Sequence, residues 1–379
     1  MEVPSYPGIY AKSGSLYLRD VASGQPLAPE MVIILTFCKV TPTSIHIAAF
    51  DDRVRQHGGV RRTAQLRERA LAEGAEVIDF PRSRSAAAAI LVRAPLSTLR
   101  VAAITLALGL RFLSLRGVIA ALVYGTWLHA TLRRRGWPHV HLETAPGVPI
   151  ILGLVLASLR VSFTAYPHNI EFMVPYQRLG EFRSHVGAID AELRIMRHAR
   201  EIFTISSFDS LSLRCFQLEA VRVLPYEPAK GIRAALAAIA RTRAAGVMSD
   251  FILIIGSIMN PPTRIGIERL LMLIAAEQEN RSFVLVGFGT EALTSLAPPN
   301  VEIRGSVAQG ELDSLMSRCA AMLIYQPPTS GMLTRMIEAT LCGISVYVMG
   351  GYAQANELAG RGVTPISNLC ELQKSDRKQ

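Results

Sequence analysis

The chain has 379 residues, of which 50% are hydrophobic and 18% are charged, and its formal net charge is +10. This composition excludes a disordered chain or a coiled coil, and the length exceeds that of one ordinary hydrophobic core, so we expect two domains. The positive charge favours anionic partners, such as nucleotide phosphates or an anionic membrane surface. We expect no nucleic-acid partner, because no basic stretch is interleaved with stacking aromatic residues.

The cysteines and the amino terminus favour a cytoplasmic protein. The first twenty residues lack the basic-then-apolar order of a secretory signal, and residues 1–30, rich in proline, glycine and serine, are predicted to form an extension. The cysteines lack CxxC spacing, which argues against a metal site or a disulfide framework and fits a reducing compartment. The five cysteines are Cys38, Cys215, Cys319, Cys342 and Cys370.

The first domain is predicted to open with a strand–helix–strand unit. Apolar runs at residues 32–37 and 44–50 indicate strands, and a helical pattern then leads to another strand at 76–80. Gly58 and Gly59 precede the helix. They suit a turn where the backbone approaches a phosphate, because glycine has no side chain to block the approach. An ordinary tight turn explains the glycine pair equally well.

Residues 86–132 are strongly apolar but contain several arginines. The apolar runs at 101–110 and 117–128 are much shorter than the roughly 20 residues needed to span a bilayer, so we expect helices buried in the core. The alternative is an interfacial surface, whose apolar faces enter a membrane while its arginines meet anionic headgroups. The arginines are Arg93, Arg100, Arg111 and Arg116, followed by the basic run 133–135.

Further strands are predicted at residues 140–143 and 161–165, and the alternation of helices and strands continues over 189–225. The strand at 161–165 leads into His168. A histidine there can donate to a sugar or a phosphate near neutral pH, although a histidine after a strand more often has a structural role. Proline and glycine cluster at 226–231, which predicts a linker between domains.

A second alternating series begins at residue 251. Strands are predicted at 251–257, 282–287 and 300–304, with a helix from about residue 264 to Ala276. Arg264 stands at the start of that helix, where a guanidinium could neutralise a diphosphate through bidentate contacts. A solvated arginine is the alternative.

The stretch 321–350 carries the strongest functional signal. Apolar runs at 322–325 and 345–348 indicate buried strands, and residues 329–331 are of the types that cap a helix. The amino end of the helix between these strands would offer unpaired N–H groups and partial positive charge to a phosphate. An ordinary strand–helix–strand crossover with one glutamate is the alternative interpretation.

The same helix is predicted to have one apolar side and a glycine at its end. Leu333, Ile337 and Leu341 are spaced four residues apart, which would place them on one side. Gly343 is the expected carboxyl-terminal cap.

This stretch resembles the donor site of GT-B glycosyltransferases, in which a loop, a helix amino terminus and a glutamate hold a nucleotide-sugar. The glutamate corresponds to Glu338, and Ala339, Gly343 and Val346 also match the family pattern. A second glutamate of the common motif lies eight residues earlier, where this chain has Ser330. The contacts expected with the donor sugar therefore depart from the family pattern, whereas the part of the motif that binds the nucleotide is intact.

The resemblance also implies the other site residues. Ser257 stands where the family often has an arginine and Arg264 near the place of its lysine, while His168 matches a histidine beside the cleft. The implied catalytic residues are His168 and Arg264. The implied donor-binding residues are Gly58, Gly59, Ser257, Arg264, Gly305, Ser306, Val307, Ser330, Gly331, Thr334 and Glu338.

We therefore expect an α/β protein of the GT-B type, with two Rossmann-like domains whose parallel sheets face each other across a cleft. Residues 1–30 would be the extension, 31–226 the acceptor domain and 227–379 the donor domain. The implied activity is transfer of a sugar, of the hexosyl type, from a nucleotide-sugar to a hydroxyl acceptor, such as a lipid-linked glycan. We expect it in polysaccharide or glycolipid synthesis at the inner face of the plasma membrane.

We expect no cofactor and no metal, because no DxD motif occurs in the expected setting. One alternative is a sugar-nucleotide epimerase of similar fold. The other is a catalytically degenerate GT-B protein that serves as a partner or scaffold.

Overall fold

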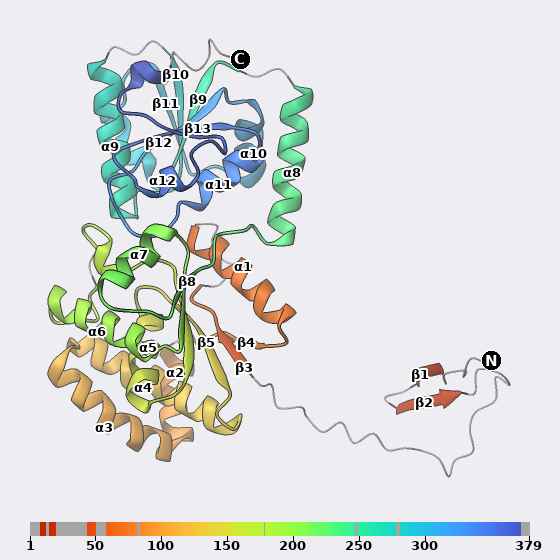
Figure 1. The fold of residues 1–379 in the computed structure, drawn as a ribbon, viewed down its shortest axis with the longest axis vertical. Helices are drawn as coiled ribbons and strands as arrows, with labels where there is room; N and C mark the ends of the chain where they lie inside the picture. The colour runs from red at the N-terminus through yellow and green to blue at the C-terminus, as the bar shows by residue number, and fades with distance from the viewer. Residues whose placement is uncertain are drawn as a thin grey trace. The chain divides into compact units, whose positions relative to one another are not determined.

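A computed structural model (Figure 1) describes residues 8–12, 15–19, 44–50, 58–81, 84–177, 179–246, 249–277 and 281–372. The chain forms two compact units, Met1–Thr41 and Pro42–Gln379. In the first unit, β1 (Gly8–Lys12) and β2 (Ser15–Arg19) form an antiparallel hairpin. The strand predicted at 32–37 and Cys38 lie outside the described residues.

The second unit begins with a parallel sheet of six strands in the order β4-β3-β5-β6-β7-β8. The order reverses between β3 and β5, and ligands of parallel α/β sheets bind at the carboxyl ends of strands beside such a reversal. The strands are β3 (Ser44–Ile47), β4 (Glu76–Ile78), β5 (His139–Thr144), β6 (Phe163–Pro167), β7 (Glu201–Thr204) and β8 (Val221–Val223).

Helices surround this first sheet, and α5 is its most deeply buried helix. Every residue from Pro149 to Ala157 in α5 is buried, as expected for a helix that is apolar on all sides. The helices are α1 (Gly58–Ala72), α2 (Arg84–Arg93), α3 (Pro95–Arg111), α4 (Leu115–Arg134), α5 (Val148–Leu159), η2 (Glu171–Met173), α6 (His185–His198) and α7 (Ser207–Cys215).

The second sheet is also parallel and six-stranded, in the order β11-β10-β9-β12-β13-β14. Its central strands are short runs of buried apolar residues, which suits strands covered on both faces. Here the order reverses between β9 and β12. The strands are β9 (Phe251–Ile255), β10 (Ser282–Val286), β11 (Val301–Gly305), β12 (Ala321–Tyr325), β13 (Ser345–Met349) and β14 (Val363–Pro365).

Each face of the second sheet has its own core. One core joins the sheet to α8, α10 and α11, and the other joins it to α9 (Figure 1). The helices are α8 (Lys230–Ala245), α9 (Pro261–Ala276), η3 (Thr290–Leu296), α10 (Gln309–Arg318), α11 (Thr334–Leu341), α12 (Gln354–Glu357) and η4 (Leu369–Glu371).

Two predictions about α11 need correction. The helix begins at Thr334 without a side-chain cap, so the cap-type residues 329–331 lie in the preceding loop. Its buried side includes Met336 and Ala339, whereas Leu341 is 49% exposed. The predicted apolar side is therefore wrong, because the core lies beside the Met336 side of this helix. Gly343 follows the last turn with φ of +72°, as suits a carboxyl-terminal cap.

The apolar stretch 86–132 forms helices, but the expectation that they are buried in the core is wrong for the outer side of α3. That side exposes leucines, while the inner side buries Ser97 and Thr105 beside Val101 and Leu108. The exposed leucines are Leu96, Leu99, Leu106 and Leu110. Among the helices that the structure describes, none has the length and apolar character to cross a bilayer.

Candidate functional site

Glu338 lies in the middle of α11 and is 9% exposed. Its Oε1 accepts a hydrogen bond of 2.6 Å from the hydroxyl of Tyr226 and lies 3.8 Å from Nε of Arg61. Burial raises the pKa of Glu338, and the Arg61 charge and the Tyr226 hydrogen bond oppose that rise. Within the described residues no group donates to Oε2, so one oxygen of this carboxylate remains available as an acceptor.

The loop before α11 binds a carboxylate of the first-sheet region. The Ser330 hydroxyl donates to Oδ1 of Asp209 at 2.7 Å and accepts from the Ile170 N–H at 2.6 Å. The Gly331 N–H donates to both Asp209 oxygens, at 3.2 and 3.1 Å. Burial raises the pKa of Asp209, and the hydrogen bonds from Ser330, Ser206 and Gly331 oppose that rise. The donors that we expected on a phosphate therefore do bind an oxyanion, although it is a side chain of the protein.

The position of Gly331 requires a glycine, because a side chain there would be strained and would collide with its neighbours. Its φ is +85°, and a Cβ atom there would lie 1.9 Å from Oδ1 of Asn169. The same Cβ position is 3.2 Å from the backbone oxygen of His168. The close approach brings the Gly331 loop against the segment that follows β6.

His168 belongs to a buried group of polar side chains centred on Glu143, at the end of β5. Oε2 of Glu143 accepts from Nε2 of His168 at 2.9 Å, and its Oε1 lies 2.7 Å from Nε2 of His46. Glu143 also accepts from the Ala49 N–H and the Thr63 hydroxyl. Although burial opposes it, the hydrogen bonds from His168 and His46 hold the pKa of Glu143 below its usual range.

This arrangement determines which ring nitrogen of His168 donates to Glu143. An ionised carboxylate can only accept, so His168 carries its proton on Nε2, and a neutral ring then has a lone pair on Nδ1. Nδ1 is buried and has no hydrogen-bond partner within the part of the chain that the structure describes. A neutral histidine held in this way can accept a hydrogen bond at Nδ1, whereas the predicted donation to a sugar or a phosphate is wrong for Nε2, whose proton is bound by Glu143.

The glycine pair at the start of α1 meets the start of α11. A Cβ atom on Gly58 would lie 3.1 Å from Oγ1 of Thr334. Both glycines belong to the first turn of α1, so the prediction that they form a turn before the helix is wrong. The structure brings the loop of Ser330 and Gly331, the first turn of α1 and the backbone of His168 into one group, with Glu338 one turn further along α11.

A second group of predicted residues lies at the carboxyl ends of β9 and β11. Ser257 follows β9, and its hydroxyl accepts from the Met259 N–H at 3.3 Å. Gly305 ends β11, and its carbonyl accepts from the Gly287 N–H at 2.8 Å. Ser306 and Val307 follow directly.

Arg264 pairs with a residue that belongs to neither group. Its Nε donates to Oε1 of Glu268 at 2.8 Å, one turn along α9, and its side chain is 56% exposed. Among the described residues, no hydrogen bond or ion pair joins the side chain of Arg264 to another predicted site residue. Its assignment as a phosphate ligand stays a prediction.

Several residues of this region were missed from the sequence. Glu143 occurs near the end of a buried strand, and Asp209 in the first turn of the helix that follows β7, positions that can signal a site residue. Tyr226 was placed in the linker, and nothing in its surroundings in the sequence marks it as a partner of Glu338. Arg335, in the first turn of α11, was hidden among apolar neighbours.

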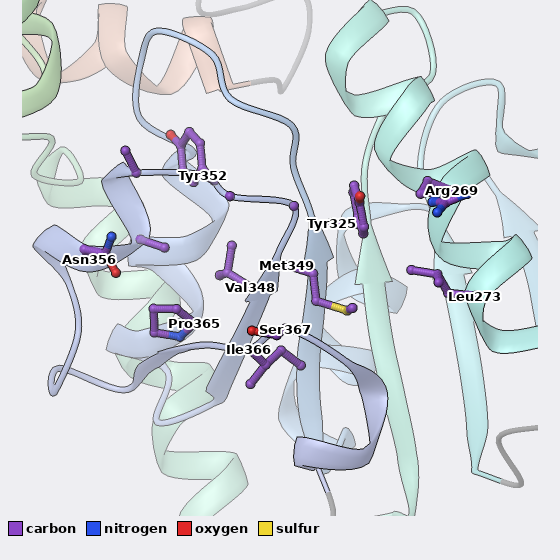
Figure 2. Close-up of a pocket in the computed structure, with 14 residues that line it drawn as sticks. Arg269, Leu273, Tyr325, Val348, Met349, Tyr352, Asn356, Pro365, Ile366 and Ser367 are labelled. Atoms are coloured by element: carbon purple, nitrogen blue, oxygen red, sulfur yellow. The ribbon is translucent and has the colours of Figure 1, made fainter. Parts of the chain in front are cut away.

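A cavity of about 570 Å³ lies elsewhere in the second-sheet domain, between the ends of β12, β13 and β14 and helix α9 (Figure 2). Tyr325, Met349 and Ile366 line it, with Arg269 and Leu273 on the α9 side. None of the predicted site residues lines this cavity, so we place the candidate site around Glu338.

Tyr352, which also lines the cavity, connects it to the Gly331 loop. Its hydroxyl donates to the Gly331 carbonyl at 2.6 Å and accepts from the Leu333 N–H at 3.1 Å.

Across the described ranges, no three histidine, cysteine or acidic side chains are grouped as a metal site would require.

Comparison with known proteins identifies the class of fold. No protein-family model matches the chain, and no curated protein matches it. Among solved structures, sucrose-phosphate synthase from Thermosynechococcus elongatus is similar over 82% of this chain and 83% of its own, with a TM-score of 0.57 and 15% identity. WaaG, a glycosyltransferase involved in lipopolysaccharide biosynthesis, is similar over 88% of this chain and 89% of its own, with a TM-score of 0.51 and 14% identity.

These similarities extend across both sheets, so the protein has the GT-B fold of two Rossmann-like domains. The predicted fold class is confirmed.

Proposed function

We propose that this protein is a glycosyltransferase that moves a sugar from a nucleotide-sugar to a hydroxyl acceptor. The observation that carries this proposal is Glu338, a buried carboxylate at the carboxyl edge of the second sheet with one oxygen available. The two hydroxyls of a ribose are donors that such a carboxylate can bind without a proton of its own. The similar structures, which are a sucrose-phosphate synthase and a lipopolysaccharide glycosyltransferase, support the same class of reaction.

The chemistry assigned to the other residues follows from their contacts. As the sugar leaves, negative charge develops on the diphosphate, and preorganised N–H groups and the dipole of α11 stabilise it. The Gly331 N–H serves this role once the Asp209 carboxylate has released it, so Asp209 and the donor compete for one amide. Nδ1 of His168 accepts a hydrogen bond from a sugar or acceptor hydroxyl. We propose no essential metal.

A screen of nucleotide-sugars by thermal shift tests the proposal. A donor present at one hundred times its Kd should raise the free energy of unfolding by about 2.7 kcal/mol. The stabilising donor is then incubated with hydroxyl acceptors, and a glycosylated product is the expected result. Epimerised donor without transfer would identify an epimerase, and binding of none of the nucleotide-sugars would favour a scaffold.

We also propose that the protein attaches to the anionic inner surface of the plasma membrane, where a lipid-linked glycan would be the acceptor. The support is the outer side of α3, whose leucines are 65% to 73% exposed at Leu96, Leu99, Leu106 and Leu110. Contiguous exposed apolar surface of this kind marks an interaction site. Arg111 and Arg116, at the end of α3 and the start of α4, are exposed, and their ion pairs with Asp190 at 3.7 Å and Glu181 at 3.5 Å are long. Anionic headgroups can compete for such exposed arginines.

A further inference from the structure

Arg335 lies in the first turn of α11. Its side chain is half-buried, and its Nε is buried without a hydrogen-bond partner among the described residues. No acidic side chain of the described residues forms an ion pair with it. Burying an unpaired charge costs free energy, so such a residue persists in a stable fold when it has a partner outside the protein.

The guanidinium lies where the strand order of the second sheet reverses. Nη1 of Arg335 is 3.8 Å from the position that a Cβ atom would take on Gly256, the residue after β9. Arg335 itself lies on α11, which follows β12. Because the order reverses between β9 and β12, the crevice at their carboxyl ends is the expected ligand position of this domain.

The N–H groups of the Arg335 guanidinium form no hydrogen bond with the described residues. Thr263 and Ile267, in the first turns of α9, bound the same space beside Gly256. Burial lowers the pKa of Arg335 to about 10, and the nearby Tyr352 opposes that effect, so the side chain is still positive at neutral pH. A guanidinium has five N–H donors in a planar fork that matches two oxygens of a phosphate.

We propose that Arg335 binds the diphosphate of the nucleotide-sugar donor. This inference rests on the proposed function, since it names the protein cation that neutralises the charge of the donor. Arg264, by comparison, is already paired with Glu268 and exposed, and Ser257 carries no charge. The diphosphate would then lie between the end of β9 and the start of α11.

The test measures binding of inorganic pyrophosphate, UDP, GDP, ADP and the corresponding nucleosides by calorimetry. Arg335→Met keeps the length of the side chain and removes the charge, and Arg335→Lys keeps the charge without the fork. Arg318→Met is the matched control. Arg318 is an exposed arginine that ends α10, just ahead of β12, so it lies at the amino ends of the strands, away from the carboxyl ends where Arg335 lies.

Arg335→Met should weaken binding of pyrophosphate and of the preferred nucleoside diphosphate about ten- to a hundredfold, without weakening the nucleoside. Arg335→Lys should recover part of the loss. The ligand-free Arg335→Met protein should melt at the same temperature as the wild type or higher, because an uncompensated charge has been removed. A structural arginine would give a lower melting temperature.

Three results overturn the inference, and they separate it from the proposed function. If the wild type binds a nucleoside diphosphate and Arg335→Met binds it equally well, Arg335 is not the ligand, while the proposed function stands. If the wild type binds neither pyrophosphate nor any of the nucleoside diphosphates, the proposed function fails as well. A loss in Arg335→Met that the nucleoside shares equally also contradicts a phosphate contact.

Discussion

Glu338 and Gly331 allow the sharpest predictions at the scale of single residues. Glu338→Gln keeps an acceptor for the Tyr226 hydroxyl but turns the other carboxylate oxygen into a donor. A ribose hydroxyl that donates to this oxygen would lose its acceptor, so nucleotide affinity should fall by roughly 1–3 kcal/mol. The fold should survive, because glutamine is as good a helix former as glutamate.

The melting temperature and the nucleotide Kd are measured on the same purified Glu338→Gln protein. Glu219→Gln, at an exposed carboxylate, is the control for the loss of one charge. Lost stability with intact nucleotide binding would remove Glu338 from the site.

Gly331→Ala tests the close approach between the loop before α11 and Asn169. The new methyl group would meet Oδ1 of Asn169, and alanine is strained at a φ of +85°. Gly343→Ala is the matched control, since Gly343 has a φ of +72° but no atom within 4 Å of its Cβ position. Both variants should lose about 1 kcal/mol to the backbone strain alone.

Gly331→Ala should lose at least about 1 kcal/mol more, as overpacking does. Urea denaturation of both proteins gives the comparison. Equal losses would mean that the loop and Asn169 separate freely in solution.

At the scale of elements, α3 has an unusual distribution of side chains. A helix on a globular protein normally turns its apolar side inward. In α3 the outer side exposes four leucines, whereas the inner side buries the hydroxyls of Ser97 and Thr105. The outer side is therefore at least as apolar as the inner one, which suits contact with lipid.

Replacing Leu99 and Leu106 with glutamine should release the protein from anionic vesicles. Each leucine fully buried in the membrane contributes about 1.5–3 kcal/mol, so the double variant should bind at least a hundredfold more weakly. Co-sedimentation with vesicles of acidic lipid measures the effect. Binding of the wild type should weaken as salt rises, because the arginine contribution is screened.

The control for the α3 variant replaces Leu71 and Met272 with glutamine, since both are exposed apolar residues, on α1 and α9. This control should bind vesicles like the wild type. A wild type that stays in the supernatant at low salt would show that the outer side of α3 is not a membrane surface.

At the scale of the whole molecule, buried acids make stability depend on pH. Glu192 accepts two backbone hydrogen bonds, from Glu171 and Phe172, and burial raises its pKa to about 7 from 4.5. The neighbouring Glu171 also has a raised pKa, because it is buried beside Glu192. Between pH 4.5 and about 7, the folded protein therefore keeps on Glu192 a proton that the unfolded chain has lost.

The free energy of unfolding should therefore fall as pH rises from 4.5 to 7, by about 1.4 kcal/mol per pH unit for one proton. Glu192→Gln should reduce this slope by the share of one proton, with Glu171 supplying the remainder, and Glu219→Gln should leave it unchanged. Denaturation curves recorded across this pH range give both slopes. Stability that rises through the window in the wild type would contradict the assignment.

The order of elements could be predicted from the sequence because local signals act within a few residues. Short apolar runs bounded by turn residues gave β9, β12 and β13 with ends that differ from the structure by two residues or fewer. The position of Glu338 in the middle of a helix was predicted in the same way. Such patterns depend on the repeat of the backbone, which is the same in every fold.

The partners of these residues depend on packing between distant segments. The Gly331 N–H meets the carboxylate of Asp209, which is 122 residues away in the chain, and Tyr226 meets Glu338 across 112 residues. No local pattern records such pairs, because the order of strands in each sheet decides which loops lie side by side, and the packing of one sheet's loops on the other's decides which of them meet. The same order places Arg335 beside Gly256, although the two lie on segments that follow different strands.

The sequence by itself therefore determined the alternation of strands and helices, the two Rossmann-like series and the helix that carries Glu338, since each depends on local periodicity. The tertiary structure decided which side of α3 faces outward, because both sides carry enough apolar residues to be buried. It also decided which of two arginines forms an ion pair. Arg264 lies one turn from Glu268 and is neutralised within its own helix, whereas Arg335 forms no ion pair with an acidic side chain of the described residues.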